Sequence, residues 1–216
     1  MIFAVVNESK LVSEADVRSW VTACDAQLQI DVGPAWSRVP VDVEYFTSRA
    51  AAPASSGLFV VVDSITVAGA EAYHTEDGGR IEGFIGVSEA QADGVNPSVD
   101  LSHELLEAFA DPFVNASVSD LAGKSYDMEI CDPVQDTTYA IAGVLVSGFV
   151  LPSWCDAEAT QGPYDRLVRL TSAFQLSPGG YAMYTDATGR HQLGMKPARR
   201  QASLRSKRRV ACGFQP

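Results

Sequence analysis

The segment 100–111 constrains the fold of this chain more than any other, because its polar and apolar residues separate on a helical wheel. It reads DLSHELLEAFAD. At about 100° per helical residue, Glu107 lies about 40° and Glu104 about 100° from His103. The leucines and Phe109 lie between about 160° and 300° on the same wheel. One face is therefore suited to burial, and the other gathers an imidazole and several carboxylates.

The polar face of this helix has the composition of a metal site. Carboxylates on one stripe repel each other and resist desolvation unless a cation lies among them. His103 and Glu107, one helical turn apart, supply the nitrogen and oxygen ligands that suit zinc. We therefore predict that both bind a metal ion. An ordinary pair of His103 and Glu107 on a solvated helix face is the alternative.

The motif formed by His103, Glu104 and Glu107 resembles the zincin metallopeptidases, whose helix carries His-Glu-x-x-His. The resemblance implies a zinc-dependent peptidase in which Glu104 is the general base. This chain departs from the family at Glu107, where zincins have a second histidine. The resemblance covers about residues 1–112, and it implies that the substrate pairs with an edge strand at Gly83–Val87.

The remainder of the chain is similar to uncharacterised bacterial and phage proteins that carry the same His-Glu-x-x-Glu helix. The segments that carry this similarity are Glu-Ile-Cys-Asp-Pro, from residue 129, and Phe-Val-Leu-Pro-Ser-Trp, from residue 149.

A catalytic zinc needs a third protein ligand, and the sequence offers several acids. Glu129 is the preferred candidate because an acid on a strand after the helix can reach back, as a glutamate does in the gluzincin branch. Asp111 and Asp132 remain alternatives; Asp111 could instead anchor the end of the helix. Two acids beside His103 would weaken the field on bound water, so Mn²⁺ or another divalent metal could replace Zn²⁺. His74 precedes a polar turn and reads as a surface residue.

Tyrosine and cysteine are the two other residue types that could contribute to the site. Tyr181 and Tyr184 follow a Pro-Gly-Gly turn and could stabilise an oxyanion, but aromatic core packing is the preferred reading. The cysteines show no CxxC spacing, which argues against a cysteine-based zinc site. Cys131 and Cys155 flank a hairpin-like segment and are the favoured disulfide pair.

Hydrophobic patterning predicts an α+β fold: a zincin-like mixed sheet packed on the active-site helix, followed by a β-rich C-terminal half. Ser13 should cap a helix to about Gln29. Strands are expected at residues 2–7, 41–46, 58–62, 81–87 and 137–151, with a last strand entered at 177–184, and a further helix at 163–174. We assign residues 1–190 to a single metallohydrolase domain and 191–216 to a basic, flexible tail.

Charge restricts the partners of the chain. The net charge is −11, although seven basic and no acidic residues lie between Lys196 and Arg209. An acidic body argues against a broad nucleic-acid-binding face and leaves only the tail for such contacts. The sequence has no signal peptide and no stretch long enough to span a membrane, so we expect a cytoplasmic protein or one released by a non-classical route. A peptide or protein substrate is the expected partner, and the oligomeric state stays open.

A second class of function remains open. It is a zincin-shaped structural or interaction protein, for example one associated with virions, whose metal site is vestigial or only stabilises the fold. Nucleic-acid binding through the basic tail is the third option.

Overall fold

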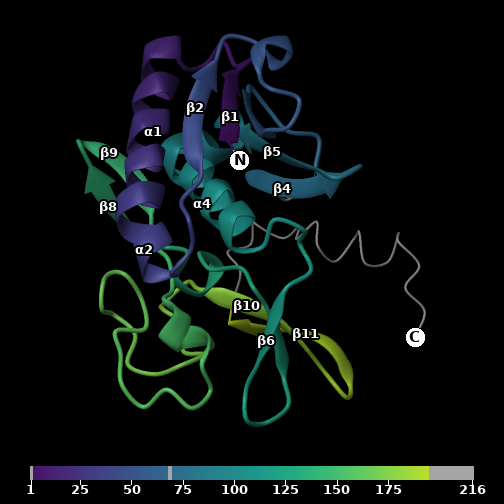
Figure 1. The fold of residues 1–216 in the computed structure, drawn as a ribbon, viewed down its shortest axis with the longest axis vertical. Helices are drawn as coiled ribbons and strands as arrows, with labels where there is room; N and C mark the ends of the chain where they lie inside the picture. Colours follow the sequence, from purple (N-terminus) through teal and green to yellow (C-terminus); the bar gives the residue numbers. More distant parts are fainter. Residues whose placement is uncertain (1, 68–69, 195–216) are drawn as a thin grey trace.

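The computed structural model describes residues 2–67 and 70–194, which form an α+β fold (Figure 1). The basic segment 196–209 lies outside the described residues. The first half contains β1 (Ile2–Asn7), α1 (Glu14–Ala26) with a π-helical turn (Gln27–Val32), α2 (Gly33–Ala35), β2 (Asp42–Phe46), a 3-10 turn (Arg49–Ala51), β3 (Gly57–Val62), β4 (Ala72–Asp77), β5 (Arg80–Gly86), α3 (Val87–Ala92) and α4 (Pro97–Ala110). The second half contains β6 (Ser117–Ser119), β7 (Ser125–Asp127), a 3-10 turn (Asp132–Val134), β8 (Thr138–Ile141), β9 (Val144–Ser147), a 3-10 turn (Pro152–Cys155), β10 (Tyr181–Asp186) and β11 (Gly189–Gly194).

The first half is built on a five-stranded sheet with the order β2-β1-β3-β5-β4. β1, β2, β3 and β5 run parallel, and β4 pairs antiparallel with β5. The two edge strands are therefore β2 and β4; β2 packs against α1, and β4 packs against α4. The prediction of an edge strand at Gly83–Val87 is wrong, because that segment forms most of β5 and pairs on both sides. The polar turn at Asp77–Arg80 folds β4 back along β5, which the sequence did not reveal as a strand pair.

Both long helices pack on one face of this sheet. Ser13 caps α1 through a reciprocal capping box with Asp16, which confirms the predicted helix start. Val17 of α1, Leu105 of α4 and Phe3 of β1 belong to the same buried cluster. The opposite face of the sheet has only a small apolar cluster of its own. The polar residues of α4 therefore lie on the face of the sheet that the two helices cover.

Helix α4 begins and ends as its sequence predicts. The Asn96 side chain accepts a hydrogen bond from the Ser98 amide, Pro97 occupies the first helical turn, and the helix ends at Ala110, before Pro112. Every residue of α4 is buried, the polar ones included. The alternative of a solvated polar face is therefore wrong. The helix runs between the five-stranded sheet and the β-rich C-terminal half, which covers its other side (Figure 1).

A buried polar network fastens α4 to the β8–β9 hairpin. The Ser102 hydroxyl donates to Gln27 Oε1 at 2.6 Å and accepts from the Ser147 amide at 3.0 Å. The Gln27 amide in turn donates to the Ser147 carbonyl at 2.8 Å. Each of these polar groups is fully buried, so their mutual hydrogen bonds offset a large desolvation cost. The network fixes the helix against the segment that follows the site.

The C-terminal half differs from the sequence prediction in two places. Residues 163–174 form a loop and not a helix, because the Asp165 carboxylate accepts hydrogen bonds from the amides of Leu167, Arg169 and Leu170 and so competes with helical bonding. The proposed boundary at residue 190 falls within β11, which pairs with β10 along its whole length. The predicted strands at 137–151 and after residue 177 are confirmed by β8, β9 and β10.

The predicted disulfide is also wrong. Cys131 and Cys155 are both free thiols. Cys131 is turned toward α4, where its Sγ lies 3.8 Å from the His103 carbonyl oxygen. Among the described residues, no helix combines the length and apolar character that crossing a bilayer requires.

The packing of α4 on the sheet predicts a stability effect. Leu105 is fully buried, so Leu105→Ala should lower the free energy of unfolding by about 2–5 kcal/mol through lost burial and a residual cavity. Leu121 is 79% exposed, and Leu121→Ala should change it by no more than about 0.5 kcal/mol. Urea denaturation followed by circular dichroism compares the two. Equal effects would contradict the packing described here.

Candidate metal centre

His103 and Glu107 meet on the buried face of α4. The Nε2 atom of His103 lies 3.1 Å from Oε1 of Glu107, one helical turn away. The two residues are only 7% and 4% exposed. The spacing on the wheel therefore does bring the imidazole and the carboxylate together, as the sequence predicts.

A second acid reaches the same imidazole nitrogen from the segment after β7. Oδ1 of Asp132 lies 3.3 Å from Nε2 of His103. Asp132 begins a short 3-10 turn that Pro133 continues, and this turn directs its carboxylate back toward α4. Asp132 was one of the alternatives for the third ligand.

Glu129 and Asp111 have other contacts. Glu129 is partly buried and shares a hydrogen bond with the Glu107 carboxylate. Asp111 accepts hydrogen bonds from the backbone amides of Asn115 and Ala116 at 3.1 and 2.9 Å. Asp111 thus anchors the chain at the end of α4, the role that the sequence analysis gave as its alternative to metal binding. Glu129 remains at the site as a partner of Glu107.

The spacing of His103 to each carboxylate matches that of two metal ligands. Two ligands of a tetrahedral zinc, each about 2.0–2.1 Å from the ion, lie about 3.3–3.4 Å apart. The distances of 3.1 and 3.3 Å from His103 Nε2 to Glu107 and Asp132 are close to this value. Around His103, the residues whose ligand atoms all lie within 4.8 Å of one another are His103, Glu107 and Cys131, so the Asp132 carboxylate would have to move toward Glu107 to complete a tetrahedral set.

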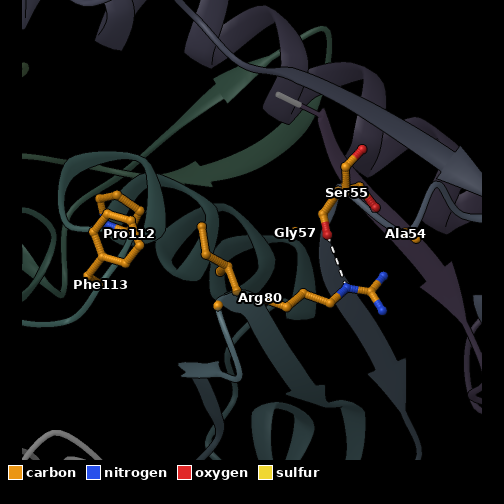
Figure 2. Close-up of a pocket in the computed structure, with 9 residues that line it drawn as sticks. Ala54, Ser55, Gly57, Arg80, Pro112 and Phe113 are labelled. Atoms are coloured by element: carbon orange, nitrogen blue, oxygen red, sulfur yellow. Dashed lines mark hydrogen bonds between the residues drawn. The ribbon is translucent and has the colours of Figure 1, made fainter.

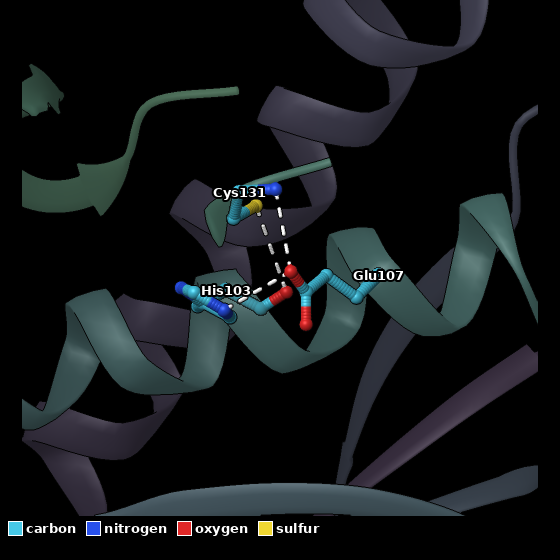
Figure 3. Close-up of side chains that lie close together, drawn as sticks. All are labelled: His103, Glu107 and Cys131. Atoms are coloured by element: carbon cyan, nitrogen blue, oxygen red, sulfur yellow. Dashed lines mark hydrogen bonds and ion pairs between the residues drawn. The ribbon is translucent and has the colours of Figure 1, made fainter. Parts of the chain in front are cut away.

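Cys131 is a neighbour of the site that the sequence reasoning missed. A ligand atom from each of His103, Glu107 and Cys131 lies within 4.8 Å of the others. Figure 3 shows these three side chains close together. The Cys131 amide also donates to Glu107 Oε1 at 3.3 Å. A CxxC pattern detects only paired cysteines, so it does not reveal a single cysteine ligand. The sequence position of Cys131, between the acids Glu129 and Asp132, is the feature that indicates its place near the site.

Burial and neighbouring charges have opposite effects on the pKa values of His103 and Glu107. Burial alone would lower the pKa of His103, but the charge of Glu107 and a hydrogen bond to Asp132 outweigh it and raise that pKa well above its usual value. The pKa of Glu107 is lowered, because the attraction of His103 exceeds the effect of burial. Burial, with the charges of Glu107 and Asp132, raises the pKa of Glu129 well above its usual range. Without a cation, the cluster therefore holds extra protons, which a bound metal would displace.

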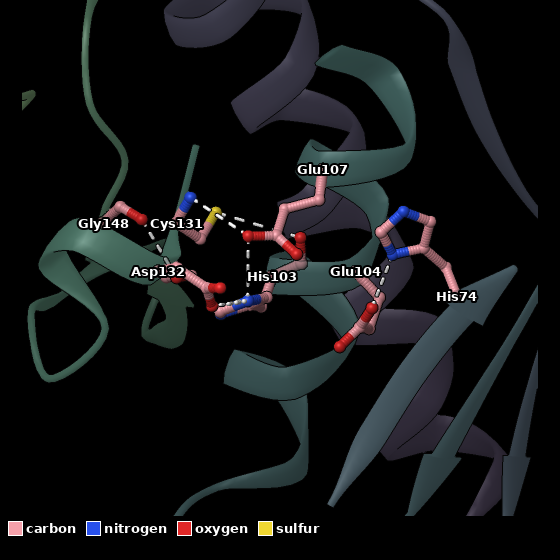
Figure 4. A network of polar contacts seen from close by, with 8 residues as sticks. His74, His103, Glu104, Glu107, Cys131, Asp132 and Gly148 are labelled. Atoms are coloured by element: carbon pink, nitrogen blue, oxygen red, sulfur yellow. Dashed lines mark hydrogen bonds and ion pairs between the residues drawn. The ribbon is translucent and has the colours of Figure 1, made fainter. Parts of the chain in front are cut away.

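Glu104 lies beside these ligands and contacts a histidine from the sheet. Its Oε2 is 2.8 Å from Nδ1 of His74, which is on the edge strand β4 (Figure 4). His74 is 7% exposed, so its reading as a surface residue is wrong. The folding of β4 against α4 creates this contact across residues far apart in the sequence.

The two tyrosines have different positions. Tyr181 is buried, and its hydroxyl hydrogen-bonds Asp132, an arrangement that orients the carboxylate in the way that outer partners orient metal ligands. Burial, followed by the charges of Asp132 and Glu107, raises the pKa of Tyr181 well above its usual value. Tyr184 stacks against Tyr126, with ring centroids 5.4 Å apart, which agrees with the aromatic packing preferred from the sequence.

A pocket elsewhere on the surface does not coincide with this cluster. It is lined by residues 54–57, Gly79, Arg80 and Ile81, and by Pro112 and Phe113 beyond α4 (Figure 2). Arg80 Nε donates to the Ser56 carbonyl at 3.1 Å along its wall. The only titratable side chain lining it is Arg80, whereas the cluster on α4 brings histidines and several acids together.

Comparisons of this chain with models of known protein families, with curated proteins and with solved structures find no match in any of the three. The function is therefore inferred from the geometry of the site.

The two candidate third ligands can be separated by conservative substitutions. Asp132→Asn should weaken zinc binding by more than about 100-fold, the upper end of the loss expected for an outer partner. Glu129→Gln should cost about 10–100-fold at most, because the glutamine amide can still hydrogen-bond Glu107. Competition with a fluorescent zinc chelator measures both constants. The reverse order would assign Glu129 as the ligand.

Proposed function

We propose that this chain is a zinc-dependent peptidase whose metal ion is held by His103, Glu107 and Asp132. The observation that carries the proposal is the pair of contacts at 3.1 and 3.3 Å that two carboxylates make with one buried imidazole nitrogen. Three protein ligands leave one position of a tetrahedral ion for water or substrate, the arrangement of catalytic zinc sites. Mn²⁺ is the second metal that two carboxylate ligands would suit.

The role of Glu104 follows from its place beside the ligands. A metal ion bound here would polarise a substrate carbonyl and lower the pKa of a water molecule. Glu104 would take a proton from the attacking water and later give it to the leaving amine, the general acid–base step of such hydrolysis. Its contact with His74 holds the carboxylate in place on the sheet side of the ligands. Tyr181 likewise orients the Asp132 carboxylate through a hydrogen bond from its hydroxyl.

The sheet supports a peptide as the substrate. β4 is the last strand in the order β2-β1-β3-β5-β4, and it is the strand that contributes His74 to the site. A mixed sheet with an antiparallel edge strand beside the metal helix resembles the zincin arrangement. A peptide adding to the outer edge of β4 would gain main-chain hydrogen bonds and lie next to Glu104.

A structural metal site is the second candidate function. The observation that favours it is the burial of the ligands, with His103 and Glu107 7% and 4% exposed. Structural zinc sites are closed to solvent, whereas catalytic ones keep an open position. In that case a metal would stabilise the contact between α4 and the segment 129–134 and would support no turnover.

The role of Glu104 predicts a separation of binding from catalysis. Glu104→Gln should lower kcat for a quenched fluorescent peptide library by about 10²–10⁴-fold, since it removes the general base. It should still bind one zinc ion, because the ligands are on other residues. Glu158→Gln, at an exposed position, is the matched control and should behave as the wild type does.

Two results would decide against the peptidase. Full peptide hydrolysis by Glu104→Gln would remove the general base from the mechanism. A wild-type protein whose melting temperature rises with zinc, but which cleaves no peptide, would assign the site a structural role.

A further inference from the structure

A second group of metal-ligating side chains lies directly beside the first. Ligand atoms of His74, Glu104 and Glu107 all lie within 4.8 Å of one another. The group joins the edge strand β4 to the helix α4 and shares only Glu107 with the ligands of the first site. Figure 4 shows His74 and Glu104 on one side of Glu107, and Asp132 and Cys131 on the other.

The charges of this second group favour a cation. Glu104 and Glu107 are both buried, at 8% and 4% exposure, with carboxylate oxygens close enough to repel each other strongly. His74 Nδ1 contacts Glu104, and no hydrogen-bond partner for its other nitrogen is present in the described part of the chain. A histidine that only packs in a core normally has both nitrogens hydrogen-bonded. Among the described residues, the hydrogen-bond partner of this ring is therefore Glu104, the acid next to the metal ligands.

Glu107 has the chemistry to belong to both groups. A carboxylate has two oxygens with several acceptor positions, and it can bind one cation with each. Paired metal sites in hydrolases hold their ions about 3.5–4 Å apart. One oxygen of Glu107 faces His103 Nε2 at 3.1 Å, and the group with His74 lies on the opposite side of the residue.

We propose that His74, Glu104 and Glu107 form a second, weaker divalent-cation site that regulates the first. The regulatory part rests on the proposed function, because it depends on Glu104 as the general base. A cation bound to Glu104 occupies the carboxylate that must accept the proton, so the filled second site stops hydrolysis. Excess zinc is therefore an inhibitor of this protein, and one equivalent is its activator.

Metal stoichiometry tests the site without reference to activity. Calorimetric titration of the full chain, stripped of metal and then loaded with zinc, should show two binding events in the wild type. His74→Gln should retain the tight event and lose the weak one, because its amide can still donate to Glu104 but offers no imidazole nitrogen. His191→Gln is the matched control on β11 and should keep both events.

Glu104→Gln provides an independent variant if His74→Gln does not fold. It keeps the size of the side chain, leaves β4 unchanged, and should also bind a single equivalent. One binding event in the wild type, or two in a folded His74→Gln or Glu104→Gln protein, would overturn the second site.

Inhibition is measured separately. The rate at which the wild type hydrolyses a quenched peptide should rise until one equivalent of zinc is bound. It should then fall at least tenfold when the weak site is saturated with zinc. The hydrolysis rate of His74→Gln should not fall at the same zinc concentration. Two binding events with no loss of activity would overturn the regulatory role and leave the peptidase proposal standing. Two events with no hydrolysis at any zinc concentration would overturn the peptidase and keep the second cation site.

Discussion

The rest of the structure depends on the burial of both faces of α4. Its leucines pack on the five-stranded sheet, and the C-terminal half covers the face that carries His103 and Glu107. Burying an imidazole and two glutamates is costly unless each is compensated. The surrounding segments supply this compensation: β4 brings His74 to Glu104, and the turn after β7 brings Asp132 to His103.

The C-terminal half therefore has a function beyond covering the core. Its segment 129–132 delivers Glu129, Cys131 and Asp132 to one side of α4, and β10 adds Tyr181 behind Asp132. β11 anchors this part through the ion pair of Arg190 with the buried Asp127. The geometry at His103 is thus the product of two halves that meet at one helix, because His103 and Glu107 come from the first half and Asp132 from the second.

Local sequence patterns predicted much of this arrangement. The capping residue Ser13, the apolar stripe of α4 and four strands of the first sheet, β1, β2, β3 and β5, follow from periodicity and local hydrogen bonding, whereas β4 was not predicted. The pairing of His103 with Glu107 follows from helical spacing alone. Contacts between distant segments could not be found in this way. His74 lies 30 residues before Glu104, and only the antiparallel return of β4 places the two together. The choice between Glu129 and Asp132 likewise depends on a turn that directs one carboxylate to His103 and the other to Glu107.

Every role proposed for these residues requires that α4 holds a metal ion. Elemental analysis of the full chain, purified without chelators, measures this. We expect at least about one transition-metal ion per chain in the wild type, and none in the double variant His103→Ala/Glu107→Ala. A folded wild-type protein that contains no such metal, and whose melting temperature does not rise when zinc is added, would contradict it.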